Sequence, residues 1–245
     1  MRITSEQTLD HGVLERHFTL GEIPGIVWTP ASVSGSAPAP LVLLGHPGGL
    51  DTMYPRLRAR ALHCAEQGFA AATIELPGSG ARTRSAAAEQ ARADLRQTLA
   101  AGEAVDDGIV DRLILPLVEK AVPEWRAVLD DLLSLPKISG PVGFAGGVIA
   151  IAVRLAVIEP RIAAALLFAG SFVPRSTLAE ARHVTVPLHV LLQWDDESND
   201  RQSALDLFDA FGSTEKTLHA NMGGHTGVPE FEVAEGDRFF HRHLG

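Results

Sequence analysis

Five continuous apolar runs, separated by stretches of helical character, constrain the fold of this chain more than any other feature. Each run has the length and composition of a strand that is buried on both faces of a sheet. They are LVLLG at 41–45, AAATIEL at 70–76, PVGFA at 141–145, IAAALLFA at 162–169 and PLHVLLQ at 187–193. Strands that alternate with helices are joined by right-handed crossovers into a mostly parallel sheet. The sequence therefore predicts an α/β fold with helices on both faces of the sheet.

Shorter signals extend this alternation toward both ends of the chain. An opening hairpin is expected from two short strand patterns, and one more strand is expected near residues 216–220. Helices are expected between the strands and after the last one, at 54–67, 147–158, 201–211 and 230–243. The two hairpin strands are at 17–20 and 25–29. With 46% hydrophobic residues in 245, the chain can bury one sizeable core, so we expect a single domain over 1–245.

One segment interrupts the alternation of strands and helices. Between Gly80 and Leu135 the pattern predicts three helices, at about 84–100, 105–121 and 123–135, and no strand. Pro123 stands where a helix begins, so the third helix is expected to lead into the strand at 141–145. The first two then form an insertion at about 81–122. Loops at the carboxyl ends of parallel strands surround the ligand crevice, which predicts a helical cap or lid; helices packed elsewhere on the sheet are the alternative.

Several apolar residues of this insertion could line a pocket for the hydrophobic part of a substrate. They are Ile109, Leu113, Leu115, Leu117 and Val118. The same residues could equally form the inward face of a helix packed on the body of the domain.

A glycine-rich stretch lies between the strand at 141–145 and an apolar helix. It reads Gly143-Phe144-Ala145-Gly146-Gly147. A nucleophile elbow has the pattern G-x-S-x-G in the same strand–turn–helix setting, because larger side chains beside the nucleophile would collide with the strand and the helix. Both glycines of the pattern are present, and Ala145 stands where the serine would be. The alternative is a glycine-rich helix start without catalytic meaning.

An acid and a histidine follow in the order that a triad with this elbow requires. The acidic turn after the strand at 187–193 places Asp196 as the acid, with its neighbour Asp195 as the alternative. His225 follows in a glycine-rich loop before the closing helix, whereas His219 is expected inside the preceding strand and to be structural. A solvated acidic turn and a chance histidine are the competing interpretations of these two positions.

A second glycine-rich loop follows the strand at 41–45. It reads His46-Pro47-Gly48-Gly49, and it resembles the HG and HGGG turns that supply one oxyanion-hole donor in esterases. Pro47 has no N–H, so Gly48 is the predicted donor, with Gly146 as the other. His46, Pro47 and Gly49 are expected to lie around the substrate, and His46 to serve the loop scaffold more than the chemistry.

Taken together, these motifs resemble the α/β-hydrolase superfamily on the side of the dienelactone-hydrolase-like esterases. The resemblance implies a serine hydrolase with a Ser–His–Asp triad that acts on a carboxylic ester, a thioester or a lactone and needs no organic cofactor. Ala145 departs from it, since dienelactone hydrolases have cysteine at the elbow and serine esterases have serine. A methyl group cannot attack a carbonyl, so the chain is expected to be nearly inactive as a serine hydrolase.

Three hypotheses account for the alanine. It is an engineered Ser→Ala change in an esterase; it marks a natural binding protein that kept the pocket; or the chain catalyses acid–base chemistry without a serine, as a lyase, a cyclase or a cofactor-free oxygenase does. Cys64, Ser79 and Ser171 are weaker candidates for a substitute nucleophile, because none lies in an elbow pattern.

The remaining features exclude other classes of protein. A net charge of −9 disfavours nucleic acid as a partner, and no window is apolar enough for a membrane span. The polar N-terminus and the single cysteine predict a cytoplasmic protein without an internal disulfide. No metal cluster is expected, because the histidines and carboxylates are not arranged at ligand spacing. A homodimer is possible.

Overall fold

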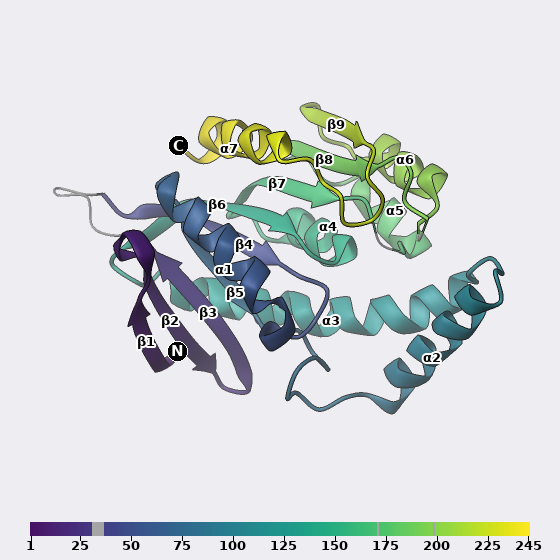
Figure 1. The fold of residues 1–245 in the computed structure, drawn as a ribbon, viewed down its shortest axis with the longest axis horizontal. Coiled ribbons are helices and arrows are strands. Elements are labelled where there is room, and N and C mark those ends of the chain that lie inside the picture. Colours follow the sequence, from purple (N-terminus) through teal and green to yellow (C-terminus); the bar gives the residue numbers. More distant parts are fainter. Residues whose placement is uncertain (31–36, 171, 198) are drawn as a thin grey trace.

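The structure is a computed structural model that describes residues 1–30, 37–170, 172–197 and 199–245. Within these residues, nine strands form one sheet in the order β1-β2-β3-β5-β4-β6-β7-β8-β9 (Figure 1). The strands are β1 (Arg2–Thr8), β2 (Leu14–Leu20), β3 (Ile23–Thr29), β4 (Ala39–Gly45), β5 (Ala70–Ile74), β6 (Ile138–Gly146), β7 (Ile162–Phe168), β8 (Leu188–Gln193) and β9 (Lys216–Asn221).

The sheet is mixed, and its parallel part contains the buried runs of the sequence. β1, β2 and β3 pair antiparallel, and β3 pairs antiparallel with β5. From β5 onward all neighbours are parallel, with β4 inserted between β5 and β6. β4 and β5 bury nearly every residue because helices cover both of their faces. The predicted α/β fold with a mostly parallel sheet is confirmed.

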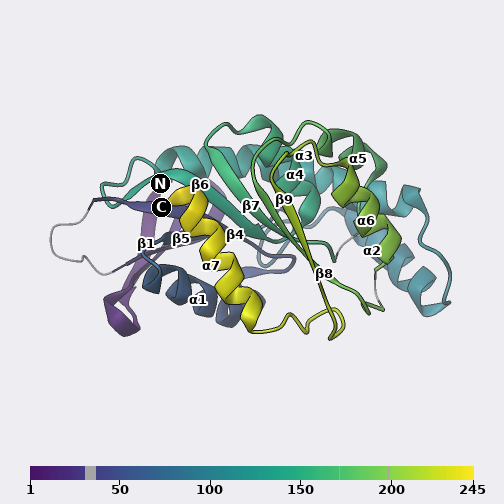
Figure 2. The same cartoon turned by 90° about the horizontal axis from the view of Figure 1, so that it is seen from above.

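The helices form a layer on each face of the sheet (Figure 2). α1 (Leu50–Glu66) and α7 (Phe231–Leu244) lie on one face, and α3 (Asp107–Leu132), α4 (Ile149–Ile158), α5 (Arg175–Ala181) and α6 (Arg201–Ala210) lie on the other. The buried apolar side chains accordingly form two clusters, one under each layer. No helix of the described residues combines the length and the hydrophobicity needed to cross a bilayer.

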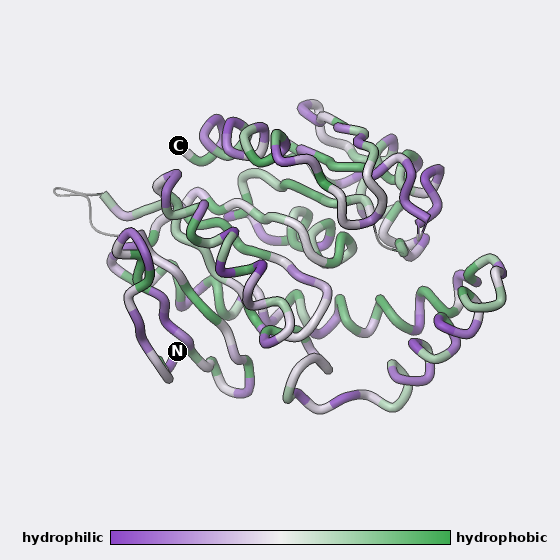
Figure 3. Tube along the Cα trace, in the orientation of Figure 1, coloured by the Kyte–Doolittle hydropathy of each residue, from purple (hydrophilic) through white to green (hydrophobic). Residues whose placement is uncertain are grey.

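Two elements differ from what the sequence pattern predicts. β1 is absent from the prediction because none of its seven residues is buried, and Figure 3 shows hydrophilic residues along it. It is held by backbone pairing with β2 and by polar side-chain contacts such as Glu6 with Arg16, which leave no hydrophobic signature. The predicted helix boundary at Pro123 is wrong. α3 runs without interruption through Pro116 and Pro123, because its apolar stripe stays buried across both prolines.

α2 (Ala86–Ala100) packs against the first half of α3, and both extend beyond the carboxyl ends of the parallel strands in Figure 1. Two helices therefore occupy the segment expected to be a cap. Since α3 is continuous, the second cap helix and the helix that precedes β6 are one element.

Candidate active site

The loops that carry the predicted site residues all follow parallel strands. They come after β4, β6, β8 and β9, so they meet at the edge of the sheet that the carboxyl ends of these strands form. In open α/β sheets this edge is where ligands bind.

Asp196 and His225 are in direct contact across two loops. Nδ1 of His225 lies 2.7 Å from Oδ2 of Asp196, within hydrogen-bonding distance. The side chain of Asp196 is 4% exposed, whereas that of His225 is 47% exposed. A buried carboxylate that holds one nitrogen of a more exposed imidazole leaves the other nitrogen open to solvent or substrate. The structure therefore brings together the acid and the histidine that the sequence singles out.

The neighbouring Asp195 has a different task. Its carboxylate accepts hydrogen bonds from the backbone N–H groups of Gly223 and Gly224, at 2.9 and 3.0 Å. These bonds from Gly224 and Gly223 lower the pKa of Asp195. Gln193 adds a bond from its Nε2 to the carbonyl oxygen of Gly224, at 2.9 Å. Asp195 and Gln193 thus fix the loop that carries His225, while Asp196 contacts the imidazole itself.

Two further residues near His225 have no signal in the sequence. Nδ2 of Asn199 donates to Oδ2 of Asp196 at 2.8 Å, the oxygen that also faces His225. The ring of Phe168, at the end of β7, meets the ring of His225 edge to face with centroids 5.7 Å apart. Phe168 is distant from His225 in sequence, and so is Asn199, whose Nδ2 also lies 3.2 Å from Nδ1 of His225, so only the tertiary structure identifies these contacts with the imidazole. Together they restrict where the imidazole can lie.

The predicted elbow lies where β6 leads into α4. Ala145 lies near the end of β6, paired with Leu44 and Leu166, and only 4% of it is exposed. The backbone then turns left-handed at Gly146 (φ 73°) and Gly147 (φ 79°), and Val148 is the N-cap of α4. The assignment of Ala145 to the nucleophile position stays a prediction from the motif.

Close approaches around the turn account for both glycines of the motif. A Cβ on Gly147 would lie 2.8 Å from Cα of Gly45 and 2.9 Å from N of His46, so no side chain fits there. Gly143 is needed for another reason, since its Cβ would meet Phe240 and Leu244 of α7 at 2.7 and 2.8 Å. These are the two positions at which the elbow pattern requires glycine.

Arg60 of α1 secures the turn from the other side. Its guanidinium donates to the carbonyl oxygens of Gly45, at 3.3 Å, and Ala145, at 3.0 Å. Because these two carbonyls belong to the ends of β4 and β6, one cation ties the loop after β4 to the turn after β6. Their sequence separation gives no hint of this link.

The loop after β4 holds the predicted oxyanion residues and is built on a buried histidine. His46 is 2% exposed, and its Nε2 donates to the carbonyl oxygen of Ile74 at 2.8 Å. Burial lowers the pKa of His46 and favours the neutral ring. The side chain of His46 therefore serves the scaffold and is not open to a substrate. Pro47 is exposed, and Gly48 and Gly49 are half-buried at the start of α1.

A buried carboxylate that the sequence analysis passed over stands behind this loop. Glu75, directly after β5, is 5% exposed and accepts the backbone N–H of Leu50 at the start of α1, at 3.1 Å. A Cβ on Gly80 would lie 2.3 Å from its Oε2, so that glycine is required for the close approach. Burial raises the pKa of Glu75. Its role is to join the loops after β4 and β5.

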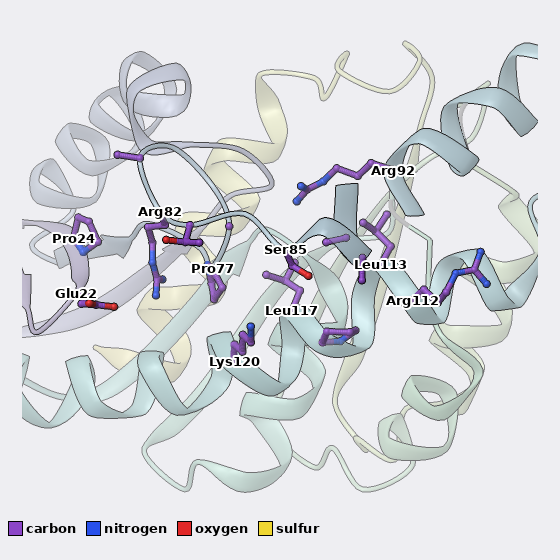
Figure 4. Close-up of a pocket in the computed structure, with 16 residues that line it drawn as sticks. Glu22, Pro24, Pro77, Arg82, Ser85, Arg92, Arg112, Leu113, Leu117 and Lys120 are labelled. Atoms are coloured by element: carbon purple, nitrogen blue, oxygen red, sulfur yellow. The ribbon is translucent and has the colours of Figure 1, made fainter. Parts of the chain in front are cut away.

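A cavity of about 510 Å³ lies between the cap helices and the loop after β5 (Figure 4). It is lined by both polar and apolar residues, among them Arg82, Ser85, Leu113, Leu117 and Lys120. Of the apolar cap residues expected to line a pocket, Leu113 and Leu117 do so, whereas Ile109 and Val118 are buried in helix packing. Neither Asp196 nor His225 lines this cavity. The cavity is therefore separate from the contact between these two residues.

The structure gives little support to the candidate substitute nucleophiles that it describes. Burial raises the pKa of the Cys64 thiol to about 11, so it is protonated and unreactive near neutral pH. Ser79 lies in a turn after β5, where its N–H donates to the carbonyl oxygen of Leu76. Ser171 lies outside the described residues.

Comparison with known proteins gives structural but not sequence matches. No family model matches the chain, and no curated protein matches it. A PEG-bound structure of a cold-adapted esterase from an Arctic intertidal metagenomic library aligns with a TM-score of 0.76 and 27% identity, covering 99% of this chain and 98% of that one. A zinc-bound structure of a cold-adapted esterase from the same kind of library aligns with a TM-score of 0.72 and 26% identity over the full length of both chains.

A more distant structure shares the fold. The acetyl xylan esterase from Paenibacillus sp. R4 aligns with a TM-score of 0.67 and 14% identity, covering 99% of this chain and 88% of that one. Together with the sheet order, these similarities show that the chain has the α/β-hydrolase fold.

Proposed function

We propose that the site of this chain is that of a carboxylic ester hydrolase, with a small ester, thioester or lactone as its substrate. The contact between Asp196 and His225 carries the proposal. It occurs at the ligand-binding edge of an α/β-hydrolase fold, in a chain that is 27% identical to a cold-adapted esterase over nearly its whole length. The dienelactone-hydrolase-like subtype is part of the proposal.

The parts of the site have distinct chemical roles. His225 acts as the general base that removes a proton from the attacking hydroxyl, and Asp196 orients the imidazole and stabilises its protonated form. Gly48 supplies one oxyanion donor from the loop after β4. With Ala145 at the nucleophile position, the second donor is the N–H of Gly146, the following residue.

The elbow of this chain has no nucleophile. Residues 145–148 are Ala-Gly-Gly-Val, without a hydroxyl or a thiol. Removing the nucleophile of a triad costs several orders of magnitude in rate, so ester turnover by this chain is expected to be close to background. A single Ser→Ala change at position 145 would account for this.

Two matched variants test the assignment. Val148→Ser places a hydroxyl at the N-cap of α4, a position that serine favours, and Ala145→Ser places the same group inside β6. Hydrolysis of short and medium p-nitrophenyl esters is then compared with the unaltered chain. We expect Ala145→Ser to raise kcat/KM by at least about 10²-fold, and Val148→Ser to leave it unchanged.

The other outcomes are equally informative. A gain from Val148→Ser alone would move the nucleophile position to the N-cap of α4. No gain from either folded variant, across ester, thioester and lactone panels, would contradict the ester-hydrolase proposal. It would favour serine-free acid–base chemistry by His225, or ligand binding alone.

A further inference from the structure

Three side chains gather on the face of the sheet that α7 covers, away from Asp196 and His225. They are His189 of β8, His219 of β9 and Glu232 in the first turn of α7. One nitrogen of each histidine and one carboxylate oxygen all lie within 4.8 Å of one another. The sequence does not reveal this cluster, because its members come from three elements and follow no ligand spacing.

The distances within the cluster suit a bound metal better than a closed hydrogen-bond network. Nδ1 of His219 lies 2.9 Å from Oε2 of Glu232. Nε2 of His189 lies 3.6 Å from the same oxygen, and this buried nitrogen has no hydrogen-bond partner among the described residues. Ligand atoms about 2.0–2.2 Å from one tetrahedral zinc are roughly 3.3–3.6 Å apart, so small shifts would bring all three onto one ion.

A second layer of contacts holds the ligands in place. Nδ1 of His189 lies 3.1 Å from Oγ1 of Thr217, and Nδ2 of Asn221 donates to the other oxygen of Glu232 at 2.9 Å. Metal-binding histidines and carboxylates in proteins are usually fixed by such partners.

Access to the cluster comes from a cavity of about 170 Å³ that His189, His219 and Thr217 help to line. The side chains of His189 and Glu232 are nearly buried, whereas that of His219 is 35% exposed. Three protein ligands and an open side leave a fourth coordination position for water.

We infer that His189, His219 and Glu232 form a binding site for a divalent transition metal, zinc above all. Two imidazoles and one carboxylate are a zinc ligand set, and they are poor ligands for magnesium or calcium, which prefer oxygen. The bound ion would join α7 to β8 and β9. Because the loop with His225 connects β9 to α7, the ion would hold the sheet to the helix at which this loop ends.

The test uses the full chain after treatment with a chelator and dialysis. Titration with zinc chloride in a calorimeter should show one site per chain, and zinc should raise the melting temperature. Cobalt(II) should give the visible absorption of a tetrahedral ion. His219→Ala, which removes the most exposed ligand, should weaken zinc binding by at least about 100-fold and abolish the rise in melting temperature.

His63→Ala is the matched control. His63 also contacts a carboxylate of α7, with its Nε2 2.9 Å from Asp237, but it belongs to no three-ligand group among the described residues. This variant should bind zinc as the unaltered chain does. If the unaltered chain shows no stoichiometric binding and no cobalt spectrum, or if both variants lose zinc equally, the inference is overturned. Magnesium and calcium should have no effect at the same concentrations.

Discussion

At the scale of single residues, adjacent carboxylates separate into two tasks. Asp195 accepts two backbone N–H groups of the loop that carries His225, and Asp196 contacts the imidazole. Neighbouring residues on a turn point in different directions, so chemically identical groups meet different partners. If the elbow receives a nucleophile, this division should appear in kinetics.

The comparison is Asp196→Asn with Asp195→Asn, each in the Ala145→Ser background. Asp196→Asn should lower kcat by up to about 10⁴-fold, because the imidazole loses its orienting and stabilising charge. Asp195→Asn weakens the hold on the loop, so a loss of about 10-fold or less is expected, with a lower melting temperature. Ester hydrolysis and thermal unfolding measure both effects. Equal losses of kcat would show that the two carboxylates are not divided in this way.

At the scale of elements, a buried ion network ties α3 to the turn between α4 and β7. Glu159, the C-cap of α4, is 2% exposed and accepts hydrogen bonds from Arg161, at 2.6 and 2.8 Å, and from Arg126 of α3, at 3.1 Å. The side-chain bonds from Arg161 are the main reason why its pKa falls from 4.5 to about 2.

This shift predicts a pH-dependent stability. A carboxyl group whose pKa is lower in the folded state stabilises the fold above its unfolded pKa, and the contribution disappears as the pH falls from about 4.5 toward 2. Glu159→Gln should therefore lower the free energy of unfolding by about 2 kcal/mol at pH 7. Urea unfolding should show that the difference in the free energy of unfolding between Glu159→Gln and the unaltered chain is smaller at pH 3.5 than at pH 7.

Glu6→Gln provides the control for that measurement. Glu6 pairs with Arg16 at the surface and is half-exposed, so its loss should change stability by less than about 0.5 kcal/mol. If the free energy of unfolding of Glu159→Gln differs from that of the unaltered chain by the same amount at every pH, the effect does not have an electrostatic origin.

At the scale of the whole molecule, the cap and the sheet enclose a cavity of about 510 Å³ beside the loops that carry the site. We propose that residues 81–122 act as a cap whose cavity receives the apolar part of a substrate. Leu117 lines the cavity from α3, and Leu99, which is 46% exposed on α2, does not. The two leucines therefore offer a matched pair.

In the Ala145→Ser background, Leu117→Trp should fill part of the cavity. The ratio of kcat/KM for octanoate over acetate esters should fall by about 10-fold, because a long chain loses its space and a short one does not. Leu99→Trp should leave that ratio within about 2-fold. If Leu117→Trp also leaves the ratio unchanged, the cavity is no acyl pocket.

A cytoplasmic location and a homodimer stay predictions from the sequence, and light scattering tests the second.

By itself the sequence determined the α/β class and most of the elements, because β4 to β8 are buried on both faces and their residues are almost all apolar. The acid and histidine positions could also be predicted, since they follow strand ends in a fixed order. β1 could not, because an exposed strand held by backbone pairing has no hydrophobic pattern.

Only the tertiary structure decided the finer points of the site. How closely α7 approaches Gly143 and the loop after β4 approaches Gly147 depends on packing that a motif cannot show. The choice between Asp195 and Asp196 depends on which side chain faces His225. The grouping of His189, His219 and Glu232 arises because β8, β9 and α7 are neighbours in space, which their separation along the chain does not predict.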